Sequence, residues 1–427
     1  MKKKLISLLL VAGLCIGTYF AAQALPTPKE NPAAAFPEKD TLHLWYADDS
    51  MTDYLTNVAA AYYEKTGIHV IPTLRTGLEY LEEIYTASAR PEEETLQMPD
   101  MYIISNDSLE KAYLSGLAIS LKDKGEVLSQ KNFPKTALDA VSYQGKYVGY
   151  PLYYETSAFL YNKTYLEEAG KEPPKTVDDI LTFADEYDAP EQVEAVFRWD
   201  VSDIFYNYYF IGNYMIVGGE AGDDSSQIDI DNDKTEECLQ IYQNLNQFFS
   251  IDTKEVTYDS VLQDFMEGKV VMTVATSDAL AKLENEKNEG GFPYEYGLAK
   301  MPDLTAQLKG RSLSVTNAIA VNGFSEKNEA AEAFAAFLET EYAQALYDAA
   351  GKLPAAYGDC YTDDKRNAFL EEYQSSISMP KLLGTSNFWV QLEICFSRIW
   401  DGAEVGQLLS ELAEQIGRQL HPKEGSV

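Results

Sequence analysis

The sequence has few histidines and cysteines, and it lacks the short motifs of several common enzyme classes. Among 427 residues there are 3 histidines and 4 cysteines. No G-x-G-x-x-G, G-x-x-x-x-G-K-[ST], G-x-S-x-G or H-E-x-x-H pattern occurs, so dinucleotide, P-loop, nucleophile-elbow and zincin sites have no support. His43 and His69 fall on neighbouring expected strands, where packing is the simpler interpretation. No metal or cofactor is therefore expected.

Basic residues are also scarce. The chain has 34 lysines and arginines against 68 acidic residues, a formal net charge of −34. Such a surface repels nucleic acid and anionic lipid headgroups, so neither is an expected partner. An apolar content of 45% is ample for packed cores, and the length predicts two to three domains.

Residues 1–24 have the pattern of an export signal or membrane anchor, with Lys2–Lys4 before an apolar run from Leu5 to Ala22. Three outcomes stay open. The chain could be cleaved at Ala22-Gln23-Ala24, be lipidated at Cys15, or keep the run as an uncleaved anchor. All three place the body of the protein outside the cytoplasm, either tethered at the extracellular face of the membrane or secreted. Residues 25–40, rich in Pro and Ala, are expected to form an extended tether.

Strands and helices alternate along the remaining chain. The patterns predict strands at Thr41–Tyr46, Ile68–Pro72, Pro99–Ser105 and Val270–Thr276, and helices at 51–67, from Thr176, from Ser325 to Gly351, and at Val405–Leu420. A strand, a helix and a strand within about thirty residues imply a right-handed crossover and parallel pairing. The sequence therefore predicts an α/β fold. The pairing of Cys238, Cys360 and Cys395 stays open.

Several segments in order resemble one family. They are "AAAYYEKTGIHV", "VSYQGKYVGYPLYYETSAFLYNKTYLEEAGKEPPKTVDDI", "DFMEGKVVMTV", "AGKLPA" and "MPKLLGTSNFWVQLE". Together they resemble the extracellular solute-binding proteins of ABC importers, family 1, the group that includes maltose- and oligosaccharide-binding proteins. The resemblance implies a type II periplasmic-binding-protein-like fold, in which two α/β lobes with mostly parallel sheets close on a ligand about a hinge of chain crossings.

The resemblance also divides the chain. Residues 41–154 and 315–362 are expected to form lobe 1, and residues 155–314 and 363–427 lobe 2. One crossing would lie near Glu155, an acidic residue inside the apolar segment "YPLYYETSAFLYNK". A carboxylate is costly to bury without a partner, so its place at a crossing lets it face the cleft.

Acidic loops follow three of the expected strands, where ligands bind in open α/β sheets. These loops are Ala47-Asp48-Asp49, Asn106-Asp107 and Ser277-Asp278. Carboxylates accept hydrogen bonds from hydroxyls, which suits a polyhydroxylated neutral ligand or a cation. Aromatic rings can cover the C–H face of a sugar, and the candidates are Trp389, Trp199, Tyr154 and Tyr206.

By resemblance, Asp49, Asp107 and Glu155 match carboxylate positions that hold sugar hydroxyls in the maltose-binding group, and Trp389 matches an aromatic platform. Other positions depart from that group. Ile104 and Asp278 stand where stacking tryptophans are usual, Ser50 and Ser108 replace cationic contacts, and Ala47 replaces an amide. The identity of the sugar therefore stays open.

The leading hypothesis is a non-enzymatic, monomeric solute-binding protein that captures a carbohydrate, an oligosaccharide by preference, and delivers it to a membrane permease. Two alternatives remain. One is a secreted glycoside hydrolase that uses paired carboxylates across a cleft. The other is a binding protein for a polyamine or another cation, which acidic strand ends would also suit.

Overall fold

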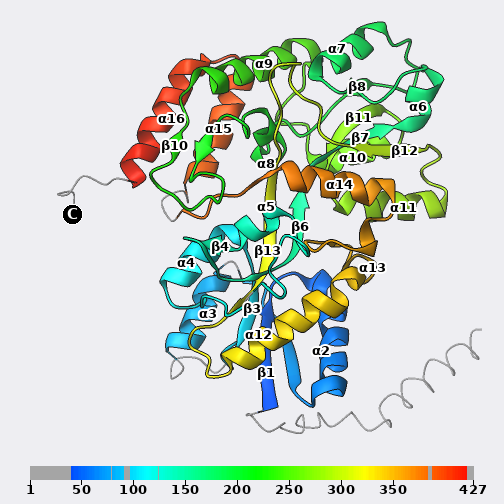
Figure 1. The fold of residues 1–427 in the computed structure, drawn as a ribbon. Helices are drawn as coiled ribbons and strands as arrows, with labels where there is room; N and C mark the ends of the chain where they lie inside the picture. The colour runs from blue at the N-terminus through cyan, green and yellow to red at the C-terminus, as the bar shows by residue number, and fades with distance from the viewer. Residues whose placement is uncertain (1–39, 78, 91–96, 124, 383–386, 421–427) are drawn as a thin grey trace, which may run out of the picture.

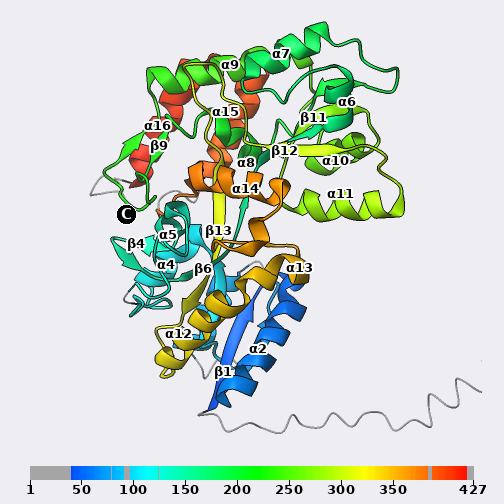
Figure 2. The same cartoon turned by 45° about the vertical axis from the view of Figure 1, so that its right-hand side comes forward.

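The computed structural model describes residues 40–77, 79–90, 97–123, 125–382 and 387–420. Within them the chain forms two α/β lobes, drawn one above the other in Figures 1 and 2. The predictions for residues 1–24 and 25–39, including the lipidation of Cys15, lie outside the described residues. None of the described helices is long and apolar enough to cross a membrane.

Lobe 1 contains a seven-stranded sheet of the order β14-β6-β13-β3-β1-β2, with β15 paired to β13. Its strands are β1 (Thr41–Tyr46), β2 (His69–Leu74), β3 (Met101–Ser105), β6 (Tyr150–Thr156), β13 (Leu313–Val321), β14 (Leu353–Pro354) and β15 (Ile377–Ser378). β1 is parallel to β2 and β3, which confirms the predicted parallel pairing. β2 continues past Pro72, where the strand was predicted to end, because it is the edge strand and needs no donor on its outer side.

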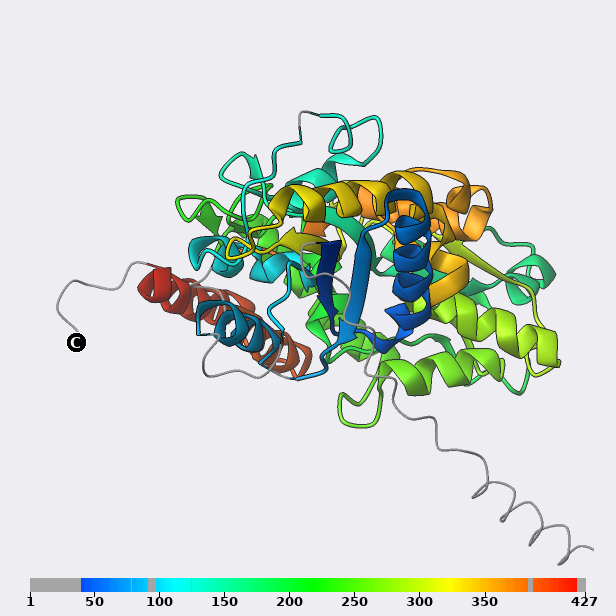
Figure 3. The ribbon, with the colours of Figure 1, turned by 90° about the horizontal axis from the view of Figure 1, so that it is seen from below.

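Helices cover both faces of this sheet. They are α2 (Thr52–Thr66), α3 (Tyr80–Ala89), α4 (Leu109–Leu114), α5 (Lys135–Ala140), α12 (Asn328–Phe337) and α13 (Leu346–Ala350), and β4 (Ser142–Tyr143) and β5 (Lys146–Tyr147) form a small hairpin. α14 (Asp364–Ser375) lies between the two sheets, where it contacts β6 of the first and β12 and β7 of the second. Successive strand residues point to opposite faces, so Leu44 packs in the core under α2 and α12, whereas Trp45 packs with α3 and α4. Figure 3 shows α2 and α12 beside the ends of β1 and β2.

One predicted helix is interrupted. The expected continuous helix from Ser325 to Gly351 consists of α12, a π-helical turn at Leu338–Tyr342, a 3-10 turn at Ala343–Ala345 and α13. The wide turn presents the carbonyl of Tyr342 to α2, where it accepts a hydrogen bond from Tyr54 Oη at 3.2 Å. Packing against α2 therefore accompanies the break, and Gly351 ends α13 with a φ of 68°.

Lobe 2 contains a four-stranded sheet of the order β12-β7-β11-β8. Its strands are β7 (Ala158–Asn162), β8 (Ala195–Phe197), β11 (Val270–Ala275) and β12 (Tyr296–Ala299), with a separate hairpin of β9 (Ile216–Val217) and β10 (Ile228–Asp229). Its helices are α6 (Lys163–Glu168), α7 (Val177–Glu186), α8 (Ile204–Asn207), α9 (Asp233–Phe249), α10 (Tyr258–Met266), α11 (Asp278–Glu289), α15 (Phe388–Trp400) and α16 (Val405–Leu420). The helix predicted from Thr176 is α7, and it begins with a capping box formed by Thr176 and Asp179.

The chain passes from the first sheet to the second through a single residue, Ser157. β6 ends in the first sheet at Thr156 and β7 begins in the second at Ala158, with Ser157 between them. The chain returns from β12 to β13, which pairs antiparallel with both β3 and β6. β6 and β13 in the first sheet and β7 in the second pair antiparallel with neighbouring strands. Both sheets are therefore mixed, whereas mostly parallel sheets were expected. The lobe boundaries at 154/155, 314/315 and 362/363 stay predictions.

The three described cysteines are free and buried. Cys238 and Cys395 lie in the core of lobe 2, and Cys360 lies in the core that includes α2 and the lobe 1 sheet. The described part of the chain therefore contains no disulfide, and each thiol acts as a small apolar core group.

Candidate ligand-binding site

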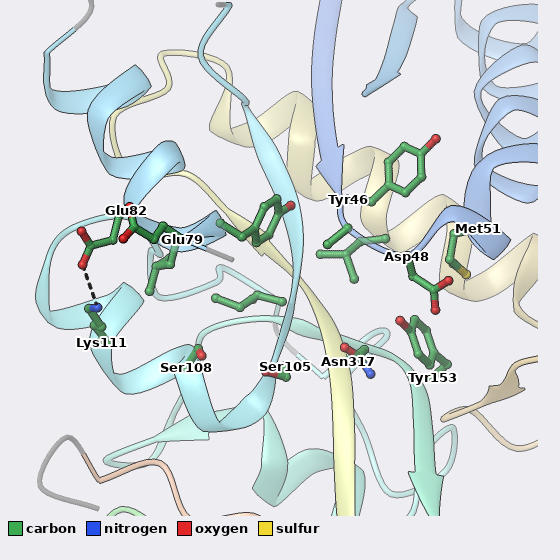
Figure 4. Close-up of a pocket in the computed structure, with 15 residues that line it drawn as sticks. Tyr46, Asp48, Met51, Glu79, Glu82, Ser105, Ser108, Lys111, Tyr153 and Asn317 are labelled. Atoms are coloured by element: carbon green, nitrogen blue, oxygen red, sulfur yellow. Dashed lines mark hydrogen bonds and ion pairs between the residues drawn. The ribbon is translucent and has the colours of Figure 1, made fainter. Parts of the chain in front are cut away.

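A cavity of about 590 Å³ lies at the carboxyl ends of β1 and β3 in lobe 1. Figure 4 shows the side chains that line it. Its polar lining includes Asp48, Ser105, Ser108 and Asn317, and tyrosines 46, 80 and 153 contribute rings. The cavity thus occupies the edge of the sheet where strand ends leave room for a ligand.

Asp48 supplies the charge nearest the end of β1. It caps the 3-10 turn at Asp49–Met51, where its Oδ1 accepts hydrogen bonds from the backbone N and the Oγ of Ser50 at 3.0 and 2.7 Å. Its Oδ2 lies 2.8 Å from Lys352 Nζ. Burial raises the pKa of Asp48, but the hydrogen bonds from Lys352 and Ser50 outweigh it, so the pKa lies below its ordinary value. The carboxylate is therefore ionised at neutral pH.

Glu155 is not buried in its apolar strand. It stands opposite Val315 of β13, and its side chain is 43% exposed. Its Oε1 lies 3.4 Å from Lys352 Nζ, so a single ammonium group joins Asp48 and Glu155. Burial lowers the pKa of Lys352, but the two carboxylates outweigh it and raise the pKa above its ordinary value. Because Glu155 faces solvent and a cation, the strand carries it without an unpaired buried charge.

Sequence reasoning missed Lys352 and Asn317 as site residues. Lys352 follows Gly351 at the start of β14, and its ammonium lies 5.5 Å from the centre of the Tyr153 ring. It stands within "AGKLPA", a segment that the resemblance singled out, but its partners are remote in sequence. Asn317 lies on β13, which pairs with β3 and β6. The position of Lys352 in a segment that resembles the family was the one sequence feature that could have identified it.

Asp49 and Asp107 lie next to the cavity lining. Asp49 is exposed on the 3-10 turn that Asp48 caps, and its Oδ1 accepts from Thr52 Oγ1 at 3.2 Å. Asp107, on the 3-10 turn Asn106–Ser108, accepts from Ser105 Oγ. The lining residues at these strand ends are their neighbours Asp48, Ser105 and Ser108. The strand-end rule thus indicated two loops that border this cavity, and turn geometry decides which residue of each loop faces it.

The carboxyl end of β11 in lobe 2 is arranged differently. Asp278, the first residue of α11, accepts from Tyr258 Oη at 2.8 Å and from Thr276 Oγ1, and pairs with Lys282 Nζ at 2.9 Å. Burial raises its pKa, but these three donors outweigh burial and lower the pKa. Tyr206 is only 8% exposed and stacks on Tyr258 with ring centres 5.1 Å apart, which corrects its interpretation as a cleft platform. The polar groups at this edge are already bonded to one another.

Trp389 is partly buried at the start of α15, with its ring centre 5.6 Å from that of Tyr208. Trp199 and Tyr154 are each 1% exposed, which corrects their interpretation as cleft platforms. Trp199 Nε1 donates to Asn207 Oδ1 at 2.8 Å inside lobe 2. Tyr154 stacks on Tyr373 at 3.8 Å between ring centres. Both rings are core residues because every large face is covered by protein.

In the described residues, no group of three or more histidine, cysteine or acidic side chains could hold a metal ion. The cavity instead combines the acidic residues Asp48, Glu79 and Glu82 and the ammonium of Lys111 with hydroxyls, an amide and rings. The carboxylate of Asp48 is held in its charged form. Such a lining can accept and donate hydrogen bonds and can also cover an apolar face.

Comparison with known proteins identifies the family. The family model described as bacterial extracellular solute-binding protein matches residues 57–366. The chain belongs to this family. A maltooligosaccharide ABC transporter solute-binding lipoprotein of Streptococcus pneumoniae R6 is 23% identical over 359 residues, which cover 81% of this chain and 80% of that protein. A maltodextrin-binding protein of Bacillus subtilis 168 is 22% identical, covering 71% of this chain and 72% of that protein.

Solved structures of this solute-binding family share the fold. An extracellular solute-binding protein from Staphylococcus aureus in complex with maltose has a TM-score of 0.77 and 20% identity, over 91% of this chain and 100% of that one. A cyclo/maltodextrin-binding protein complexed with maltotetraose has a TM-score of 0.76 and 18% identity, over 91% and 99%. The predicted family and the two-lobed α/β fold are confirmed, and the family places this solute-binding protein outside the cell.

Proposed function

We propose that this protein captures a neutral carbohydrate, an oligosaccharide, between its lobes and delivers it to the permease of an ABC importer. The observation that carries the proposal is the cavity at the ends of β1 and β3, with its carboxylates, ammonium, hydroxyls, amide and tyrosine rings. Relatives named as maltooligosaccharide- and maltodextrin-binding proteins support the sugar class and the transporter partner. The protein acts by binding alone, without catalysis.

The lining matches the surface of a sugar. Hydroxyls of a sugar both donate and accept, and the cavity offers an acceptor at Asp48 and groups of both kinds at Ser105, Ser108 and Asn317. Burial, together with the charges of Asp48 and Glu155, raises the pKa of Tyr153, so its phenol stays protonated and can donate. Tyrosine faces can pack on the C–H face of a pyranose.

A cationic ligand fits less well. Lys352 already places an ammonium between Asp48 and Glu155, at 2.8 and 3.4 Å. A polyamine at the same carboxylates would have to displace this internal cation or sit beside it with charge repulsion. A neutral ligand can bond to the carboxylates while the lysine stays in place.

A hydrolase also fits less well. A general acid in a glycosidase is a carboxyl with a raised pKa, whereas the pKa of Asp48 is lowered. Lys352 pairs with Asp48 and Glu155 through the same ammonium, at 2.8 and 3.4 Å. The pair therefore suits binding of hydroxyls better than proton transfer.

Lobe 2 would complete the site when the lobes close. Trp389 offers a partly exposed ring, and Asp278 is the polar candidate of lobe 2. Asp49, Asp107 and Glu155 are the remaining polar candidates near the lobe 1 cavity. Hinge closure would bring Trp389 and Asp278 over a ligand already held by lobe 1.

Isothermal titration calorimetry tests the proposal on the protein without its first 39 residues. The panel contains maltooligosaccharides of increasing length, cellooligosaccharides and spermidine, and each mixture is assayed for new reducing ends. We expect saturable binding of at least one oligosaccharide series, no heat from spermidine and no new reducing ends. Binding of spermidine without any sugar, or release of reducing ends, would overturn the proposal.

A further inference from the structure

A second cavity of about 510 Å³ lies beside the first on lobe 1, between α3 and α4. Its lining includes Tyr85 and Thr86 of α3, Ser115 after α4, and Leu117. Three further lining residues, Leu81, Glu82 and Lys111, also line the cavity at the strand ends. The two cavities therefore share a wall, and the second one extends the first away from Asp48 along α3.

The shared wall is an ion pair on the surface. Lys111 Nζ lies 3.5 Å from Glu82 Oε1, as the dashed line in Figure 4 shows, and the two side chains are 55% and 66% exposed. Exposed pairs of long side chains contribute little to stability, because water screens the charges and both side chains lose rotamer freedom. A ligand whose hydroxyls bond to the carboxylate and the ammonium can therefore replace this pair at little cost.

The second cavity has the chemistry of a sugar subsite. Tyr85 is 41% exposed and offers a ring face, while the buried Leu117 adds an apolar surface. Ser115 Oγ donates to the carbonyls of Lys111 and Ala112, which leaves the oxygen free to accept. A ring face beside hydroxyl and charged groups suits a pyranose better than an apolar or a compact ionic ligand.

We propose that the groove between α3 and α4 is an accessory saccharide subsite that holds the end of an oligosaccharide too long for the strand-end cavity. The chain of sugars crosses the Glu82–Lys111 pair, which opens to let it pass. This inference rests on the proposed function, since it assigns a place to the outer units of the same ligand.

The test is the dependence of affinity on chain length. Calorimetry with maltose and with successively longer maltooligosaccharides is run on the unmodified protein, on Tyr85→Ala and on Tyr85→Phe. Tyr85→Ala is expected to leave the affinity for the shortest bound sugar within twofold and to lower that for the longest about two- to tenfold, the scale of one lost ring contact. Tyr85→Phe keeps the ring and is expected to restore the affinity for long sugars.

Tyr63→Ala is the matched control, because Tyr63 is another exposed tyrosine of lobe 1, 46% exposed, on α2. It is expected to bind every length like the unmodified protein. An unchanged affinity of Tyr85→Ala for all lengths, or an equal loss at all lengths, would overturn the accessory subsite and leave the proposed function intact. Failure of the unmodified protein to bind any sugar would instead overturn the proposed function, and this inference with it.

Discussion

The carboxyl ends of the strands in the two lobes differ in whether their polar side chains are free to contact a ligand. At the ends of β1 and β3, the side chains of Asp48, Ser105 and Asn317 border an open cavity. At the end of β11, Asp278 is engaged by Tyr258, Thr276 and Lys282, and the described cavity at the strand ends has no lining residue from lobe 2. From this difference we infer a division of roles: lobe 1 supplies the polar groups that recognise the ligand, and lobe 2 supplies the ring face of Trp389.

The largest effect is expected from Asp48→Ala, which removes the charged acceptor of lobe 1. A hydrogen bond to a charged group contributes about 1.5–3 kcal/mol, so the affinity for the oligosaccharide should fall roughly 10- to 100-fold. Calorimetry measures the loss, and Asp53→Ala, an exposed acid in the first turn of α2, is the control. Wild-type affinity in Asp48→Ala would break the assignment of polar recognition to lobe 1.

Trp389→Ala should have the next largest effect, because it removes a ring face from lobe 2. The expected loss is about 0.5–1.5 kcal/mol, a two- to tenfold weaker affinity, and Trp389→Phe should recover part of it. The readout is calorimetry together with thermal unfolding, since Trp389 also packs on Tyr208. A lower unfolding temperature with unchanged affinity would assign Trp389 to the core.

Lys352→Met tests the charged pair of lobe 1 through the pH dependence of stability. The lowered pKa of Asp48 means that its contribution to stability is present above about pH 4, its unfolded value, and is lost as pH falls through the folded pKa. The raised pKa of Lys352 means that its contribution is present below about pH 10.4 and is lost as pH rises through the folded pKa. The pair therefore stabilises the fold between these limits, by about 1 kcal/mol or less for partly exposed groups.

Urea unfolding at several pH values checks this expectation. The difference in unfolding free energy between the wild type and Lys352→Met should be greatest near neutral pH and should shrink below pH about 4. A difference that is constant across pH would assign the effect to packing of the lysine stem on Tyr153.

Asp278→Asn should have the smallest effect, less than about 0.5 kcal/mol on binding, because surface substitutions outside special features change little. Its carboxylate already has three donors within the protein. A tenfold loss of affinity in the same calorimetric assay would mean that both lobes offer acids to the ligand, and the division of roles would be wrong.

Local patterns predicted much of the fold. The helix of residues 51–67 closely matches α2, because Gly67 supplies the left-handed C-cap and the apolar residues recur at helical spacing. The capping box of α7 and the parallel pairing of β1 with β2 and β3 also follow from neighbouring residues. The interruption of α12 does not, since it accompanies contacts with α2 far away in the sequence.

The site was harder to predict, because the geometry of strands and turns decides which of two adjacent residues faces the cavity. Tyr153 lines the cavity and Tyr154 is buried on the opposite face, since consecutive strand residues point to opposite sides. Asp48 rather than Asp49 faces the cavity because it caps the 3-10 turn. Lys352 pairs with a carboxylate nearly two hundred positions earlier in the chain, which no local pattern encodes.

Small-angle X-ray scattering with and without a saturating oligosaccharide tests the central claim, capture of a solute between two closing lobes, most directly. The radius of gyration of the wild type is expected to fall when the sugar binds, and Asp48→Ala at the same sugar concentration is expected to keep the larger value. An unchanged radius in a wild-type sample whose binding calorimetry has established would contradict the account.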